Sequence, residues 1–409
     1  MSAHSRKLKA LFFVAVVVCV SVLLVLGAER ALPLVCTVPV YTPALNSLNP
    51  PNLTLRFVSC DFDYTAHFNS LGLRGPGVSI AKTDKFRIAV IGSSYAFGWG
   101  VGDDACFARL LERGLQADGI DAEVLNFGKN GGAPGQYALL ARETIPLFKP
   151  DMVVVAVDQG CDIEWSNPVP FRERIPHMVW TFFPNLSSLF NAPKHPRGGG
   201  AGAPSTPDPP YEEIPFSKEG VVKLARGAYD AMPPEQRARF DGLEQKIKDE
   251  YFAGNLNQGI VLLGMNTPEL FTATLDMNSE HTKARLQFLG KCLEEIADAG
   301  DHEGVPTLVV SVPMGAYVNE SALKNCRRLG FTTVDGMLAT TAPDDAIRTA
   351  CGDLPFLTVM EAFRRQSSNP RLFFELDLHL SADGHALFAR EILPWVEGRV
   401  REAMKFQHK

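Results

Sequence analysis

Two stretches near opposite ends of the chain carry the residue types that a serine nucleophile needs. Ser94 follows the apolar run Phe86–Ile91, and Asp377 and His379 lie two positions apart shortly before the carboxyl-terminal region. A serine hydroxyl is a poor nucleophile at neutral pH unless a base accepts its proton, and a third group must hold that base in the correct tautomer. The sequence therefore offers the parts of an acyl-transfer site, provided that folding brings the two stretches together.

The elements around Ser94 predict a loop at the edge of a sheet. The β-branched run Phe86–Ile91 predicts a buried strand, and helical spacing begins after Asp103 and Asp104. In an open α/β sheet, the loop that leaves the carboxyl end of a strand is where chemistry occurs. Ser94 occupies such a loop.

Both stretches resemble known motifs. Residues Gly92–Gly100, GSSYAFGWG, resemble block I of the SGNH or GDSL-like hydrolases, in which an apolar strand is followed by Gly-Asp-Ser. Residues Asp377–His385, DLHLSADGH, resemble block V of the same superfamily, in which Asp and His precede the terminal helix. The resemblance implies that Ser94 is the nucleophile, Asp377 the orienting carboxylate and His379 the general base.

Three features near these motifs have other interpretations. Ser93 stands where the family usually carries Asp, at a position that is not the nucleophile. His385 is a rival base, but helical periodicity places it in the first turn of the last helix, so His379 is favoured. The segment Asn69–Arg74, which reads Asn-x-x-Gly-x-Arg, also occurs before block I in many bacterial members of the superfamily. We assign this segment no catalytic role.

The resemblance also implies an oxyanion hole. Its donors are the backbone N–H of Ser94, the N–H of Gly131 in block II, and an Asn side chain in block III; Gly128 is a less favoured block II candidate. Here Cys161 stands at the block III position. A thiol is a weak donor, and loss of one oxyanion donor typically lowers the rate on the order of 10²- to 10³-fold.

Three explanations for Cys161 are open at this stage. Gln159 or Asn167 supplies the missing hydrogen bond, turnover is slow, or the site no longer catalyses. Cys161 as a nucleophile in its own right is disfavoured because no His is close to it in the sequence.

The composition excludes some functions. A net charge of -6 argues against a nucleic-acid-binding surface, which would show a basic excess. The chain has no Cys-x-x-Cys motif, which argues against a structural zinc site. We expect no metal and no organic cofactor.

The first 29 residues predict export. Ala10–Ala28 is uncharged and follows Arg6, Lys7 and Lys9. At about 1.5 Å per residue the run spans roughly 28 Å, which is enough to cross the hydrocarbon core of a bilayer with the basic flank in the cytoplasm. A signal anchor is favoured over a cleaved signal peptide, and either would place the remaining chain in the periplasm or outside the cell.

Export would expose seven further cysteines to an oxidising compartment. On proximity in the sequence, Cys36 could pair with Cys60 and Cys326 with Cys351, although spacing does not determine connectivity.

Alternating strands and helices predict the architecture. Strand patterns occur at residues 86–91, 123–126, 152–158, 307–312 and 356–360. They imply a three-layer α/β/α fold with a doubly wound parallel sheet of about five strands.

The domain organisation is predicted as follows. Residues 30–85 form a stalk and approach segment, and residues 86–403 form an SGNH-like domain with an insertion at about 164–280. The insertion either caps the sheet and shapes a substrate cleft or stands apart from the site.

These features predict an exported, membrane-anchored serine esterase that acts on acyl esters of an extracellular glycan or lipid. Two alternatives remain. One is an O-acyltransferase that uses the same triad, and the other is a degenerate module that binds or assembles a cell-surface polysaccharide.

Overall fold

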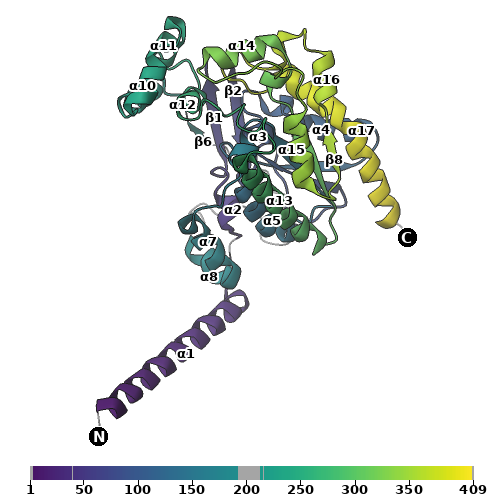
Figure 1. Ribbon diagram of the computed structural model, residues 1–409. Helices are drawn as coiled ribbons and strands as arrows, with labels where there is room; N and C mark the ends of the chain where they lie inside the picture. The colour runs from purple at the N-terminus through teal and green to yellow at the C-terminus, as the bar shows by residue number, and fades with distance from the viewer. Residues whose placement is uncertain (1–2, 39, 192–211, 215, 408–409) are drawn as a thin grey trace.

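The computed structural model describes residues 3–38, 40–191, 212–214 and 216–407 (Figure 1). Its main sheet has five parallel strands in the order β4-β3-β5-β7-β8. The strands are β3 (Phe86–Gly92), β4 (Ala122–Gly128), β5 (Met152–Asp158), β7 (Thr307–Val312) and β8 (Phe356–Thr358). The first strand of this sheet along the chain is β3. Strand β4 pairs on one side of it, and β5, β7 and β8 follow on the other side. The predicted doubly wound sheet is therefore confirmed.

Helices cover both faces of this sheet because both faces are apolar. Every residue of β3, β5 and β7 is buried, as expected for parallel strands between two helical layers. One face packs against α5 (Pro134–Phe148), α13 (Glu280–Asp301) and α15 (Ala342–Cys351). The other packs against α4 (Phe107–Ala117) and α17 (Ala382–Gln407).

A second, smaller sheet lies beside the first. Strands β1 (Leu53–Val58) and β2 (Asp63–Phe68) form an antiparallel hairpin, and β6 (Glu212–Ile214) pairs with β1 in parallel. The hairpin lies within residues 30–85, the predicted stalk and approach segment. The segment therefore contains regular structure, while its role as an approach to the domain stays a prediction.

Helix α6 (Cys161–Glu164) follows β5 and precedes the insertion. The part of the insertion that the structure describes is mostly helical, with α7 (Phe171–Phe182), α8 (Pro184–Asn191), α9 (Lys218–Asp230), α10 (Pro234–Asp241), α11 (Gln245–Phe252) and α12 (Gln258–Asn266). Helices α7 and α8 lie next to the end of α1 (Ala3–Val35), whereas α10 and α11 lie at the far end of the molecule (Figure 1).

Helix α1 is long and apolar enough to cross a membrane, and its apolar side chains are exposed along its length. Length and composition support this, but do not distinguish an anchor from a signal sequence.

All eight cysteines are free thiols. The pairings suggested by sequence proximity are therefore not present. Cys326 and Cys351 belong to the apolar clusters on opposite faces of the main sheet, so the sheet separates them. Cys36 and Cys60 are both exposed.

Candidate active site

Ser94 lies where β3 ends and the short helix α3 (Ser94–Phe97) begins. Ser93 caps this helix, because its hydroxyl accepts a hydrogen bond from the N–H of Tyr95. Gly92 allows the turn to pack closely, since a Cβ there would lie 2.6 Å from the backbone oxygen of Ala156. The turn thus places Ser94, which is partly exposed, at the carboxyl edge of the sheet.

The structure brings the three residues of the two motifs together. The Oγ of Ser94 lies 2.7 Å from Nε2 of His379. The Nδ1 of His379 lies 2.6 Å from Oδ1 of Asp377. This chain of contacts is the arrangement in which an imidazole can accept a serine proton while a carboxylate holds its ring.

The second oxygen of Asp377 also has partners. Asp377 Oδ2 accepts hydrogen bonds from Nε1 of Trp99 at 2.9 Å and from Nδ2 of Asn257 at 2.7 Å. Burial by itself raises the pKa of Asp377, but the charge and hydrogen bond of His379 and these two donors outweigh it. The pKa therefore lies below its usual value, and Asp377 is an anion.

The same ion pair acts on the imidazole. Burial lowers the pKa of His379, but the charge and hydrogen bond of Asp377, with a contribution from Asp158, outweigh burial and raise it above 6.5. The imidazolium that forms on proton transfer is therefore stabilised at this position.

His385 has a different environment. Its Nδ1 accepts a hydrogen bond from the N–H of Phe107, and the two rings stack with centroids 6.0 Å apart. Burial lowers the pKa of His385 to about 3, so the ring stays neutral. His385 contacts the start of α4, whereas His379 is the histidine whose ring lies within hydrogen-bond distance of Ser94 Oγ.

Asp61, at the tip of the β1–β2 hairpin, orients the loop that carries the carboxylate. One of its oxygens, Oδ2, accepts hydrogen bonds from the backbone N–H groups of Leu376 and Asp377, each at 2.7 Å. The next residue, Leu378, adopts a left-handed φ of 67°. A side chain more than 300 positions earlier in the sequence thus holds this turn.

Sequence reasoning missed Asp61, Trp99 and Asn257 as neighbours of the site. Asn257 has a local signal, because it is the N-cap of α12 and its Oδ1 accepts a hydrogen bond from the N–H of Gly259. That signal predicts a helix start and nothing about Asp377. Only the folded chain relates these residues to each other.

The two glycines proposed for the oxyanion hole differ. Gly131 lines the cavity in front of Ser94 and adopts a positive φ of 67°. Gly128 serves packing, because a Cβ there would lie 2.0 Å from the backbone nitrogen of Phe97. The geometry therefore favours Gly131.

Cys161 also lines this cavity. Its backbone N–H donates to Oδ1 of Asp158 at 2.6 Å. Burial, with the charges of Asp158 and Asp162, raises the pKa of the Cys161 thiol well above its usual value. The thiol therefore stays protonated, and neither a thiolate nucleophile nor a strong donor is available here.

The two amides suggested as replacements do not take over this role. Gln159 is buried, and its amide donates to Oγ of Ser311 at 3.0 Å and to Oδ1 of Asp344 at 2.7 Å. Asn167 does not line the cavity, whereas Asn130 does. Asn130 is thus a cavity-lining amide residue that the sequence analysis did not consider.

The cavity in front of Ser94 has a volume of about 270 Å³. The insertion supplies part of its wall through residues Asn257, Gly259, Ile260, Leu263 and Phe271. The interpretation of the insertion as part of the cleft is therefore preferred to that of an appendage. A larger depression of about 1,100 Å³ lies beside the β1–β2 hairpin, but none of the three converging residues lines it.

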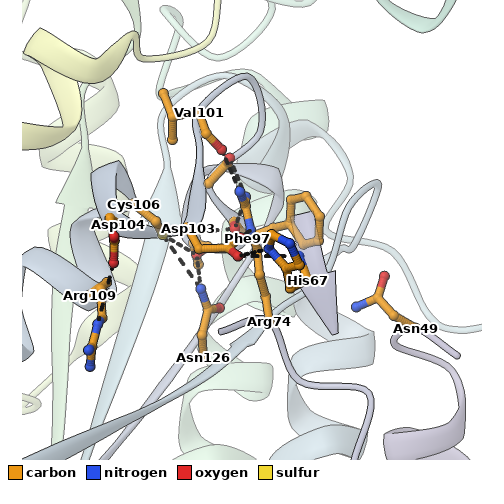
Figure 2. A network of polar contacts seen from close by, with 12 residues as sticks. Asn49, His67, Arg74, Phe97, Val101, Asp103, Asp104, Cys106, Arg109 and Asn126 are labelled. Atoms are coloured by element: carbon orange, nitrogen blue, oxygen red, sulfur yellow. Dashed lines mark hydrogen bonds and ion pairs between the residues drawn. The ribbon is translucent and has the colours of Figure 1, made fainter. Parts of the chain in front are cut away.

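Arg74, at the end of the Asn69–Arg74 segment, holds the loop that runs from Phe97 to Val101 (Figure 2). Its guanidinium donates to the backbone oxygens of Phe97 at 2.8 Å, Gly98 at 2.5 Å and Val101. It also pairs with Asp103 at 2.8 Å. Arg74 is buried, and its function in the structure is to fix this loop.

Comparison with solved structures finds similar folds at low sequence identity. A lipase/acylhydrolase from Enterococcus faecalis is 11% identical, with a TM-score of 0.36 over 76% of this chain and 96% of its own. A GDSL-like lipase from Bacteroides thetaiotaomicron is 9% identical, with a TM-score of 0.33 over 79% of this chain and 93% of its own. No protein-family model matches the sequence, and the search of curated proteins finds no match. These similarities concern the fold alone.

Proposed function

We propose that this protein is a membrane-anchored serine esterase of the SGNH type. The observation that carries the proposal is the relay in which Ser94 Oγ lies 2.7 Å from His379 Nε2 and His379 Nδ1 lies 2.6 Å from Asp377. The partly exposed serine at the mouth of a cavity gives an ester access to this relay.

In the proposed reaction, Ser94 Oγ attacks the ester carbonyl while His379 Nε2 accepts the hydroxyl proton. The tetrahedral oxyanion is held by the N–H groups of Ser94 and Gly131. His379 then donates the proton to the leaving alcohol, and an acyl-serine remains. Water, deprotonated by His379, attacks the acyl-serine and releases the carboxylic acid and the free serine.

The substrate class follows from the proposed location. With α1 in a membrane and its basic amino-terminal flank in the cytoplasm, the esterase domain faces the periplasm or the outside of the cell. Acyl esters of a glycan or lipid are the substrates of this compartment that fit an esterase. Transfer of the acyl group to a sugar hydroxyl in place of water would use the same residues.

Cys161 favours a second candidate function. In this alternative the protein is a binding module that has the fold of the esterase but no catalytic activity. A weak donor at the third oxyanion position is the specific observation behind it. This candidate predicts a well-folded protein in which Ser94 is unreactive.

Labelling with a fluorophosphonate probe tests the proposal. We expect the probe to modify the wild-type protein and the Ser93→Ala variant, and to leave Ser94→Ala unmodified. Ser93 serves as the matched control because it is the neighbouring serine and its hydroxyl caps α3. An unlabelled wild-type protein with a cooperative thermal transition would instead support the binding module.

A further inference from the structure

Helix α7 exposes an apolar stripe to its surroundings. Five large apolar side chains are between 43% and 68% exposed, namely Phe171, Ile175, Met178, Val179 and Phe182. Their spacing of four, three, one and three positions places all five on one side of the helix. A contiguous apolar surface of this kind marks a contact site.

The opposite side of α7 is attached to the domain. His177 Nδ1 lies 2.5 Å from Oε1 of Glu143 on α5, and Nε1 of Trp180 donates to the backbone oxygen of Tyr41 at 2.9 Å. At about 100° per residue, Trp180 lies on the side of the helix opposite Met178. These contacts fix the rotation of α7, so the stripe stays directed away from the domain.

Helix α8 is attached to the end of the apolar helix α1. The carboxylate of Glu29 accepts hydrogen bonds from the N–H groups of Asn185 at 2.6 Å and Leu186 at 2.8 Å. The side-chain amide of Asn185 donates to the backbone oxygen of Glu29 at 3.1 Å. Glu29 is 4% exposed, and this contact joins α8 firmly to α1.

The position of Glu29 sets the depth of α8 in a bilayer. Glu29 is the first charged residue after Lys9. A bilayer core of about 30 Å needs about 20 helical residues, so a span that begins after Lys9 ends at Glu29. Helix α8 therefore starts where the hydrocarbon ends, and its own exposed side chains Leu189 and Phe190 lie close to that boundary.

We propose that the exposed apolar faces of α7 and α8 form a membrane-interface site that inserts into the bilayer crossed by α1. This inference rests on the anchoring part of the proposed function. Continuity with the end of α1 selects lipid as the occupant (Figure 1). The exposed Arg172 and Arg174 flank the stripe on α7, as cationic side chains do beside the apolar face of interfacial helices. With two attachments, the domain is restrained in tilt as well as tethered.

The test uses the full chain in proteoliposomes, with an environment-sensitive fluorophore on one cysteine at a time. Cys36, Cys60 and Cys161 are replaced by Ser, and the label is placed at native Cys19 in α1 or, with Cys19→Ser, at Met178→Cys. Lipids with a nitroxide on the acyl chain act as quenchers. Lys291→Cys, on an exposed side of α13, is the solvent control.

We expect the labels at Cys19 and Met178→Cys to be quenched several-fold more strongly than the label at Lys291→Cys. The double substitution Ile175→Glu with Phe182→Glu should abolish quenching at Met178→Cys and leave quenching at Cys19 unchanged.

Quenching at Cys19 without quenching at Met178→Cys overturns the interface site and leaves the anchor intact. Absence of quenching at both positions overturns the anchor and the interface site together, whereas phosphonate labelling of Ser94 reports on the esterase independently. A label at Met178→Cys that is shielded from water, unquenched by lipid and crosslinked between two chains would show that a second copy covers the stripe, which also overturns the proposal.

Discussion

Cys161 is the single side chain on which the proposed rate depends most. It lines the cavity beside Ser94, and its protonated thiol is a weak donor to an oxyanion. The backbone N–H groups of Ser94 and Gly131 can still act, so we expect a slow enzyme and not an inert one.

We predict that Cys161→Asn raises kcat for p-nitrophenyl acetate by up to about 10²-fold, because it adds an amide donor to the oxyanion hole. Cys161→Ala is the matched control, since it removes the thiol without adding a donor, and should show no gain. Steady-state kinetics at one pH measure both variants. If Cys161→Asn folds normally and gains nothing, another residue already fills this position, and Asn130 is the first to replace by Ala.

The pKa of His379 predicts the pH dependence of the reaction. Only the neutral imidazole can accept the Ser94 proton, and the pKa of His379 is raised above 6.5 because Asp377 outweighs burial. The kcat/KM value should therefore rise with pH, with its midpoint above pH 6.5.

Asp377→Asn removes the charge that raises the pKa of His379 against the effect of burial. The pKa should therefore fall, and the midpoint should move to lower pH. Loss of the orienting carboxylate should also lower kcat/KM on the order of 10³- to 10⁴-fold. The pH profile of kcat/KM measures both effects. An unmoved midpoint would mean that a group other than His379 titrates in the profile.

At the level of elements, α12 supplies part of the wall of the cavity beside Ser94, the proposed nucleophile. Its residues Ile260 and Leu263 form part of the cavity wall, and Asn257 at its N-cap contacts Asp377. The insertion thus contributes both to the wall of this cavity, the proposed acyl site, and to the hydrogen bonds that hold the Asp377 carboxylate.

We predict that Leu263→Ala shifts the preference between p-nitrophenyl acetate and butyrate by roughly tenfold toward butyrate, because a few methylene groups in an apolar pocket change the rate by about this factor. The ratio of the two kcat/KM values is the measurement. Leu262→Ala on the same helix is the control, since Leu262 is packed against the core and does not line the cavity. Equal shifts in the two variants would indicate general loosening of α12.

For the whole molecule, the sequence patterns predicted the parallel sheet because its strands are short apolar runs that depend little on distant residues. The contact between Ser94 and His379 joins two local motifs whose resemblance to the superfamily implied it, and their catalytic roles stay a prediction. Strand β4 is longer than its apolar pattern. In the β1–β2 hairpin, which was missed, β2 alternates between buried and more exposed residues, whereas the burial of β1 is irregular.

The contacts of Asp377 could not be predicted, since they join four distant parts of the chain. Asp61 lies in the hairpin, Trp99 follows β3, Asn257 caps an inserted helix, and the carboxylate itself precedes α17. No periodicity or spacing in any one of these segments indicates the others.

This convergence has a consequence for biogenesis. In a nascent chain whose Asp377–His379 loop is still inside the ribosome, neither the base nor the carboxylate can reach Ser94. Under the proposed mechanism, such a chain has no hydrolytic activity. Under this mechanism activity begins only when the turn that carries Asp377 docks between the early hairpin and the inserted helix. The proposed esterase would thus remain inert until these four distant parts of the chain have folded together.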